Sequence, residues 1–222
     1  MTYLPPLEEL DADGAIRETA VEVDGDTRAA FLRKAGLGAG ALVGGGALFG
    51  ALPSVAGAAI PRSDIAILNF ALTLEFLEAS FYAEAVSKRK LSGEVQRFAQ
   101  VVAAHENAHV AFLRSALGSK AVKKPRFNFR DTTVNPTKFV QTARALEDTG
   151  VSAYLGQVGN IRNKTVLRAA GSILPVEARH AAWIRDVIAR GGNPVPAPRA
   201  FEGARSKSQI LSVVKSTGFI VS

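Results

Sequence analysis

The chain has 222 residues, of which 47% are hydrophobic, and this is enough for one buried core with appended segments. It contains no cysteine, so disulfides, thiolate metal sites and thiol nucleophiles are excluded. The formal net charge is +7, although residues 1–26 are strongly acidic, so the rest of the chain is more basic than this figure suggests. No single run is dense in Lys or Arg, so an ordinary solvated basic surface is the favoured interpretation, and contact with anionic polymers, lipid headgroups or nucleic acid is the alternative.

Residues 1–58 are interpreted as an acidic extension followed by an export signal, either cleaved or disordered. A basic stretch at residues 27–34 precedes a charge-free segment rich in Gly and Ala, which contains an A-x-A cleavage pattern at residues 56–58. The stretch resembles a twin-arginine signal, with Ala29 in place of the second arginine. We therefore expect an extracytoplasmic protein, secreted or held at the cell envelope. An uncleaved membrane anchor and a plain linker are the alternatives.

Apolar residues at helical spacing predict four helices within residues 59–192, at about 64–87, 92–117, 136–158 and 163–190. Ser63 and Asp64 are expected to cap the first of these helices. Asn135 and Pro136 should begin the third as N-cap and first helical residue. Gly-Gly-Asn-Pro at residues 191–194 should end the fourth.

The connections between these helices predict their arrangement. The first two are joined by a short polar turn, whereas residues 119–135 lack helical periodicity. Fully extended, this segment reaches about 56 Å, well beyond a 24-residue helix of about 36 Å. Short turn, long crossover and short turn predict an all-α, ferritin-like antiparallel four-helix bundle. Residues 193–222 should add a proline-rich strap and a short C-terminal helix near 206–215.

Two copies of the pattern Glu-x-x-His stand out, Glu106 to His109 on the second predicted helix and Glu177 to His180 on the fourth. Residues three apart lie on the same side of a helix, so each pair can point at one metal ion. One copy is a weak signal because chance can supply it. Two copies that use two of only three histidines are a much stronger one.

The other two helices supply a matching pair of glutamates, Glu75 and Glu147. A tyrosine follows each of them seven residues later, Tyr82 and Tyr154, and each precedes the next Glu-x-x-His by about 30 residues. The first helix pair is thus repeated as the second, which is what a symmetric two-metal site requires. A Glu from each of two helices with Glu-x-x-His from the other two is the ligand set of di-iron carboxylate proteins.

The predicted metal site therefore contains six residues, Glu75, Glu106, His109, Glu147, Glu177 and His180. Four carboxylates in an apolar bundle would repel one another unless cations neutralised them. An oxygen-rich set with imidazole suits iron or manganese. Four exposed glutamates and two ordinary histidines are the alternative, but that reading explains neither the repeat nor the doubled motif.

Four stretches, residues 71–82, 104–110, 146–154 and 173–180, resemble the ferritin-like domain family over roughly residues 62–190. The closest resemblance is to its branch of exported bacterial proteins related to desiccation- and stress-associated proteins. The resemblance implies two iron ions, with manganese as the alternative. It further implies that Glu106 and Glu177 bridge the metals and that His109 and His180 bind one metal each. Glu75 and Glu147 would be terminal ligands.

Other residues near these motifs carry weaker expectations. Glu78 is expected at the surface or behind the ligands, with ligation as the alternative. Tyr82 and Tyr154 are expected to hydrogen-bond the ligands, to act as redox-active neighbours or to be ordinary core residues. His105 gives a rival His-Glu-x-x-His reading as a zinc protease. That reading leaves the second Glu-x-x-His unexplained.

Three functions are compatible with such a site. The first is a ferroxidase-like oxidase acting on iron with oxygen or peroxide in stress defence. The second is metal storage, which is less favoured because nothing in the chain indicates shell-forming contacts. The third is a non-catalytic, metal-stabilised module that binds anionic cell-envelope polymers. Export would separate the protein from nucleic acid, and the formation of a homo-oligomer stays open.

Overall fold

The computed structural model describes residues 60–189 and 195–221. The expected acidic extension and export signal, residues 1–58, lie outside the described residues. The elements, in chain order, are α4 (Arg62–Lys88), α5 (Gly93–Leu117), the 3-10 turn η3 (Gly118–Lys120), β1 (Arg126–Phe127), α6 (Pro136–Val158), α7 (Lys164–Ala189), α8 (Lys207–Thr217) and β2 (Ile220–Val221). The prediction of an all-α chain with four long helices and a short C-terminal helix is confirmed.

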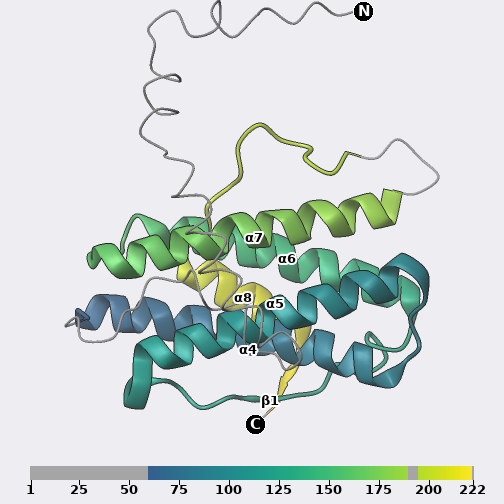
Figure 1. The fold of residues 1–222 in the computed structure, drawn as a ribbon, viewed down its shortest axis with the longest axis horizontal. Coiled ribbons are helices and arrows are strands. Elements are labelled where there is room, and N and C mark those ends of the chain that lie inside the picture. Colours follow the sequence, from purple (N-terminus) through teal and green to yellow (C-terminus); the bar gives the residue numbers. More distant parts are fainter. Residues whose placement is uncertain (1–59, 190–194, 222) are drawn as a thin grey trace, which may run out of the picture. The chain divides into compact units, whose positions relative to one another are not determined.

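The four long helices form a bundle made of two hairpins (Figure 1). Helix α4 packs along α5 and α6 along α7, while contacts of α4 with α6 and of α5 with α7 join the two pairs. Residues 121–135, between η3 and α6, form the long crossover that the sequence predicts. Helix α8 packs against α6 and is thereby attached to the side of the bundle.

The apolar core of the bundle consists of two clusters. On α5, Val102 belongs to the first cluster and Phe112 to the second. On α7, Ile184 belongs to the first cluster and Ile173 to the second. Both Glu-x-x-His motifs fall between these positions, so an apolar layer lies on either side of them along the helices. Helix α4 is long and apolar enough to cross a membrane, but 67% of its most apolar window is buried. Its composition is accounted for by its place in the core.

The helix ends confirm two predicted starts and correct a third. Asn135 caps α6 by accepting a hydrogen bond from the backbone N–H of Lys138, at 3.0 Å. Ser206 begins α8 with a capping box. The prediction that Ser63 and Asp64 cap the first helix was wrong, because α4 begins at Arg62 after Pro61.

Asp64 instead stabilises a different part of the bundle. Its buried carboxylate accepts hydrogen bonds from the backbone N–H groups of Arg162 and Asn163, where the chain enters α7. These donors precede a helix and have no intrahelical partner of their own. Asp64 therefore fixes the first turn of α4 against the connection between α6 and α7.

The C-terminal segment holds the crossover in place through a pairing that the sequence did not predict. β1 and β2 pair antiparallel, with Arg126 opposite Val221 and Phe127 opposite Ile220. Further back, the backbone N–H of Arg205 donates to the carbonyl of Ser152 on α6, at 3.0 Å. A side chain at Gly156 would meet the Arg205 carbonyl, since a Cβ there would lie 1.9 Å from its oxygen. Glycine at this position lets the strap lie directly on α6 just before α8.

Candidate metal centre

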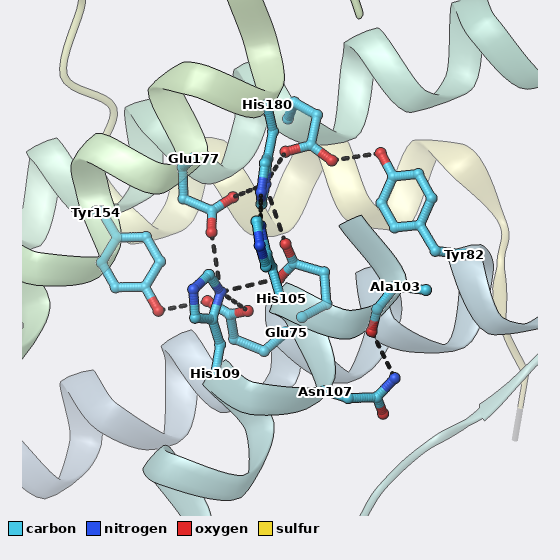
Figure 2. A network of polar contacts seen from close by, with 11 residues as sticks. Glu75, Tyr82, Ala103, His105, Asn107, His109, Tyr154, Glu177 and His180 are labelled. Atoms are coloured by element: carbon cyan, nitrogen blue, oxygen red, sulfur yellow. Dashed lines mark hydrogen bonds and ion pairs between the residues drawn. The ribbon is translucent and has the colours of Figure 1, made fainter. Parts of the chain in front are cut away.

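All six residues predicted as ligands meet in the middle of the bundle (Figure 2). Helices α4 and α6 each contribute a glutamate, and α5 and α7 each contribute a glutamate and a histidine. Every one of these four glutamates is fully buried, and His180 is 2% exposed. The alternative of exposed glutamates is therefore wrong. The predicted positions form one internal cluster of oxygen and nitrogen donors.

The cluster divides into two overlapping groups of four residues, Glu75, Glu106, His109 and Glu177 in one, and Glu106, Glu147, Glu177 and His180 in the other. Within each group, one donor atom from every residue lies within 4.8 Å of all the others. Glu106 and Glu177 belong to both groups, while the other residues belong to one each. The division follows the internal repeat, because each group contains one histidine and one unshared glutamate.

The first group is arranged around Nδ1 of His109. This atom lies 3.2 Å from Oε2 of Glu75 and 3.1 Å from both Oε2 of Glu106 and Oε1 of Glu177. One ring nitrogen carries at most one proton, so it cannot donate a normal hydrogen bond to three oxygens at once. Metal–ligand bonds of about 2.1 Å at right angles place neighbouring donor atoms about 3 Å apart. The spacing around His109 fits donors that share one cation.

The second group has the same design around Nδ1 of His180. This atom lies 3.2 Å from Oε1 of Glu106, 3.2 Å from Oε2 of Glu147 and 4.0 Å from Oε2 of Glu177. Glu106 thus turns one oxygen toward each histidine, and Glu177 does the same. A carboxylate with one oxygen in each of two donor groups can bridge two ions.

Several donor atoms of the cluster have no hydrogen bond within the described residues. They are Oε1 of Glu106, Oε2 of Glu147, both carboxylate oxygens of Glu177 and Nδ1 of His180. A buried polar atom without a partner costs about 1–3 kcal/mol, and more if it is charged. Five such atoms directed at one another are therefore costly as a purely structural feature. They fit metal binding, because a cation in each donor group would give these atoms the partners that they lack.

The electrostatics of the cluster show how strongly it attracts positive charge. Burial, followed by the negative charge of Glu177, raises the pKa of Glu106 well above its usual range. Burial also raises the pKa of Glu177, to about 7. Burial alone would lower the pKa of His109, but the charge of Glu75 and the surrounding carboxylates raise it far above its ordinary value. Protons or metal ions must supply the charge that holds these carboxylates together.

Tyr82 and Tyr154 bind the glutamates of the opposite helices. The Tyr82 hydroxyl, on α4, donates to Glu147 on α6, and the Tyr154 hydroxyl, on α6, donates to Glu75 on α4. Seven residues along a helix is a rise of about 10.5 Å, so neither tyrosine is placed to reach the glutamate of its own helix. This reciprocal pairing, in which the tyrosine of each helix binds the glutamate of the other, requires α4 and α6 to run antiparallel. Each bond occupies the carboxylate oxygen that is directed away from the histidines.

The third histidine, His105, also belongs to the site. Its Nδ1 lies 2.8 Å from Nε2 of His180, and the two rings stack with centroids 5.1 Å apart. A hydrogen bond at Nε2 fixes the orientation of the His180 ring and leaves Nδ1 directed at the carboxylates. His105 is absent from both donor groups. The zinc-protease reading is therefore not supported, and the residue acts by orienting His180.

Of the two positions expected for Glu78, at the surface or behind the ligands, the structure shows the second, because the residue is 3% exposed. It stands near the centre without joining either donor group. A Cβ added to Gly150 would lie 3.1 Å from Oε2 of Glu177 and 3.4 Å from Oε1 of Glu78, so both carboxylates adjoin the same glycine. The sequence contained a signal for this burial, since Glu75, Glu78 and Tyr82 follow the spacing of one helix face.

The comparison with protein families agrees with this arrangement. The model of the ferritin-like domain family matches residues 63–190, which is more than half of the chain. The chain belongs to the ferritin-like domain family. The match includes both hairpins of the bundle and all six candidate ligands, and ends before α8. The search of curated proteins finds no match to the chain.

For this ferritin-like bundle we expect stability to fall with rising pH when metal is removed. Glu177, with a folded pKa of about 7 against an ordinary 4.5, keeps its proton in the folded chain after the unfolded chain has lost it. Its contribution is therefore present below pH 4.5 and is lost as the pH rises through about 7. Thermal melting of the chelator-treated proteins should show the melting temperature of Glu177→Gln rising relative to that of the wild type from pH 5 to pH 8. A constant difference in melting temperature between the two proteins over that range would contradict the raised pKa of Glu177.

Proposed function

We propose that this ferritin-like protein binds two divalent metal ions, one beside His109 and one beside His180. Glu106 and Glu177 would bridge the ions, and Glu75 and Glu147 would each bind one. The observation that carries the proposal is the placement of the two shared carboxylates, each with one oxygen in each donor group. Four carboxylates and two neutral imidazoles balance the charge of two divalent ions.

We infer that the ions are iron and that the protein is a ferroxidase-like oxidase, with manganese as the alternative metal. An oxygen-rich donor set containing imidazole suits both of these metals. A bound ferrous pair would supply electrons to dioxygen or peroxide. The chain itself contributes a dry site, since apolar clusters lie on both sides and the glutamates are fully buried. Tyr82 and Tyr154 hold the unshared carboxylates in orientation.

Two further parts of the proposal rest on sequence alone. Residues 27–58 support export to the cell envelope or beyond, where the protein would act in defence against iron and peroxide stress. The basic body supports contact with anionic envelope polymers. Mapping the N-terminus of the secreted protein tests the first part, because an intact Met1 would contradict cleavage.

The metal site is tested by substituting Glu106→Ala and His180→Ala in the full chain. We expect the wild type to bind two ferrous ions per chain anaerobically and both variants to lose at least one, because Glu106 serves both groups and His180 one. Metal analysis after gel filtration measures the stoichiometry, and an oxygen electrode measures consumption on exposure to air. Asn107→Ala is the matched control, because Asn107 lies in the same motif and is exposed.

The outcomes separate the proposals. Unchanged metal content in both Glu106→Ala and His180→Ala would show that the site is wrong. Two ions bound without oxygen consumption would contradict the oxidase and favour the non-catalytic, metal-stabilised module. Circular dichroism of each variant confirms that the helices are retained, so loss of metal is not loss of fold.

A further inference from the structure

A cavity of about 270 Å³ lies between α4, α6 and α8, beside the candidate metal centre. Its walls are mostly apolar and include Leu77, Leu146, Val213, Val214 and Phe219. An apolar cavity of about 150 Å³ is large enough to take up benzene. This cavity can therefore hold an organic molecule somewhat larger than one aromatic ring. Exposed residues of α6 at its rim, Gln141 and Ala145, connect it with solvent.

Among the described residues that line this cavity, Glu78 is the one ionisable residue. Its side chain is buried and makes no hydrogen bond to another described residue, but its oxygens are not among the buried atoms sealed off without a partner, so the carboxyl opens onto the cavity. Buried carboxyl groups are normally paired, because an unpaired one keeps the full cost of its desolvation. A ligand with one polar group, seated against the apolar wall, would give this carboxyl a partner inside the cavity.

The walls exclude two other kinds of occupant. A free metal cation would exchange its water shell for leucine, valine and phenylalanine side chains with one carboxylate, which is unfavourable. A polypeptide segment would need partners for all its backbone N–H and C=O groups, whereas the wall offers five polar side chains, two of whose hydroxyls already donate within their own helices. A small molecule that is apolar over most of its surface meets neither difficulty.

We propose that this cavity is a binding site for a small, largely apolar organic molecule whose single polar head group, such as a hydroxyl, hydrogen-bonds to Glu78. The inner end of the site is at Gly150, where the carboxylates of Glu78 and Glu177 both adjoin the glycine. A bound molecule is thus a neighbour of the candidate metal centre. Binding itself needs only the cavity and Glu78, so it goes beyond the proposed function and does not depend on metal.

Binding is tested with benzyl alcohol and toluene as probes on the full chain, labelled with ¹⁵N and freed of metal by chelation. We expect saturable shifts of the Thr149 and Gly150 amide signals, with benzyl alcohol bound at least fivefold more tightly than toluene. Glu78→Leu should remove that preference, because the head group loses its partner. Equal preference in wild type and Glu78→Leu would overturn the role of Glu78.

The location of the site is tested by filling it from the α8 side with Val213→Trp. Val213 lines the cavity and is only partly buried, so the larger ring can enter the cavity without rebuilding the core. We expect at least tenfold weaker binding of both probes. Leu211→Trp is the matched control, since Leu211 lies on the same helix, is 42% exposed and does not line the cavity. Unchanged binding in Val213→Trp, or no saturable binding to the wild type, would overturn the site.

Metal content of the same variants keeps this test separate from that of the proposed function. Val213→Trp should still bind two ferrous ions, because it touches none of the six candidate ligands. If Val213→Trp loses probe binding but keeps its metal, the result supports the cavity as a binding site that is separate from the metal centre. Absence of metal from the wild type, with probe binding intact, would contradict the proposed function and leave the cavity standing.

Discussion

Four carboxylates buried around two imidazoles form the constraint on which the rest of the structure depends. Like charges at this spacing in an apolar bundle repel one another, and their desolvation is costly. The pKa of Glu106 is raised first by burial and then by the charge of Glu177, so it reflects both costs. Such a cluster is stable only if cations compensate it, as protons or as metal ions. The overlap of the two donor groups at Glu106 and Glu177 is the observation from which we propose a pair of metal ions.

The surrounding fold holds the cluster rigid and largely dry. Apolar clusters lie on both sides of the Glu-x-x-His motifs, and the tyrosines of α4 and α6 each hold the glutamate of the other helix. Asp64 fixes the start of α4 against the entry into α7. The C-terminal segment adds β2 to the crossover and α8 to the side of α6, where it forms a wall of the cavity beside Glu78. The cavity thus depends on a part of the chain that lies outside the family match.

Much of the fold and the core of the site followed from the sequence, because helical periodicity and an internal repeat are local or regularly spaced signals. The missed features depend on contacts between distant residues. Asp64 has the sequence context of a helix cap, yet its partners lie nearly 100 residues away, at Arg162 and Asn163. The strand pair has two residues on each side, too short for any pattern. The contact of His105 with His180 depends on how α5 and α7 are rotated in the bundle, which spacing alone does not determine.

The central claim is that the two donor groups bind two ions through shared carboxylates. Anomalous X-ray scattering at the iron edge, from crystals of the full chain loaded with ferrous ions anaerobically, tests it most directly. The account predicts two peaks per chain inside the bundle, one about 2.1 Å from Nδ1 of His109 and one at a similar distance from Nδ1 of His180. Carboxylate density of Glu106 and Glu177 should reach both peaks. A single peak, or iron bound only outside the cluster, would contradict it.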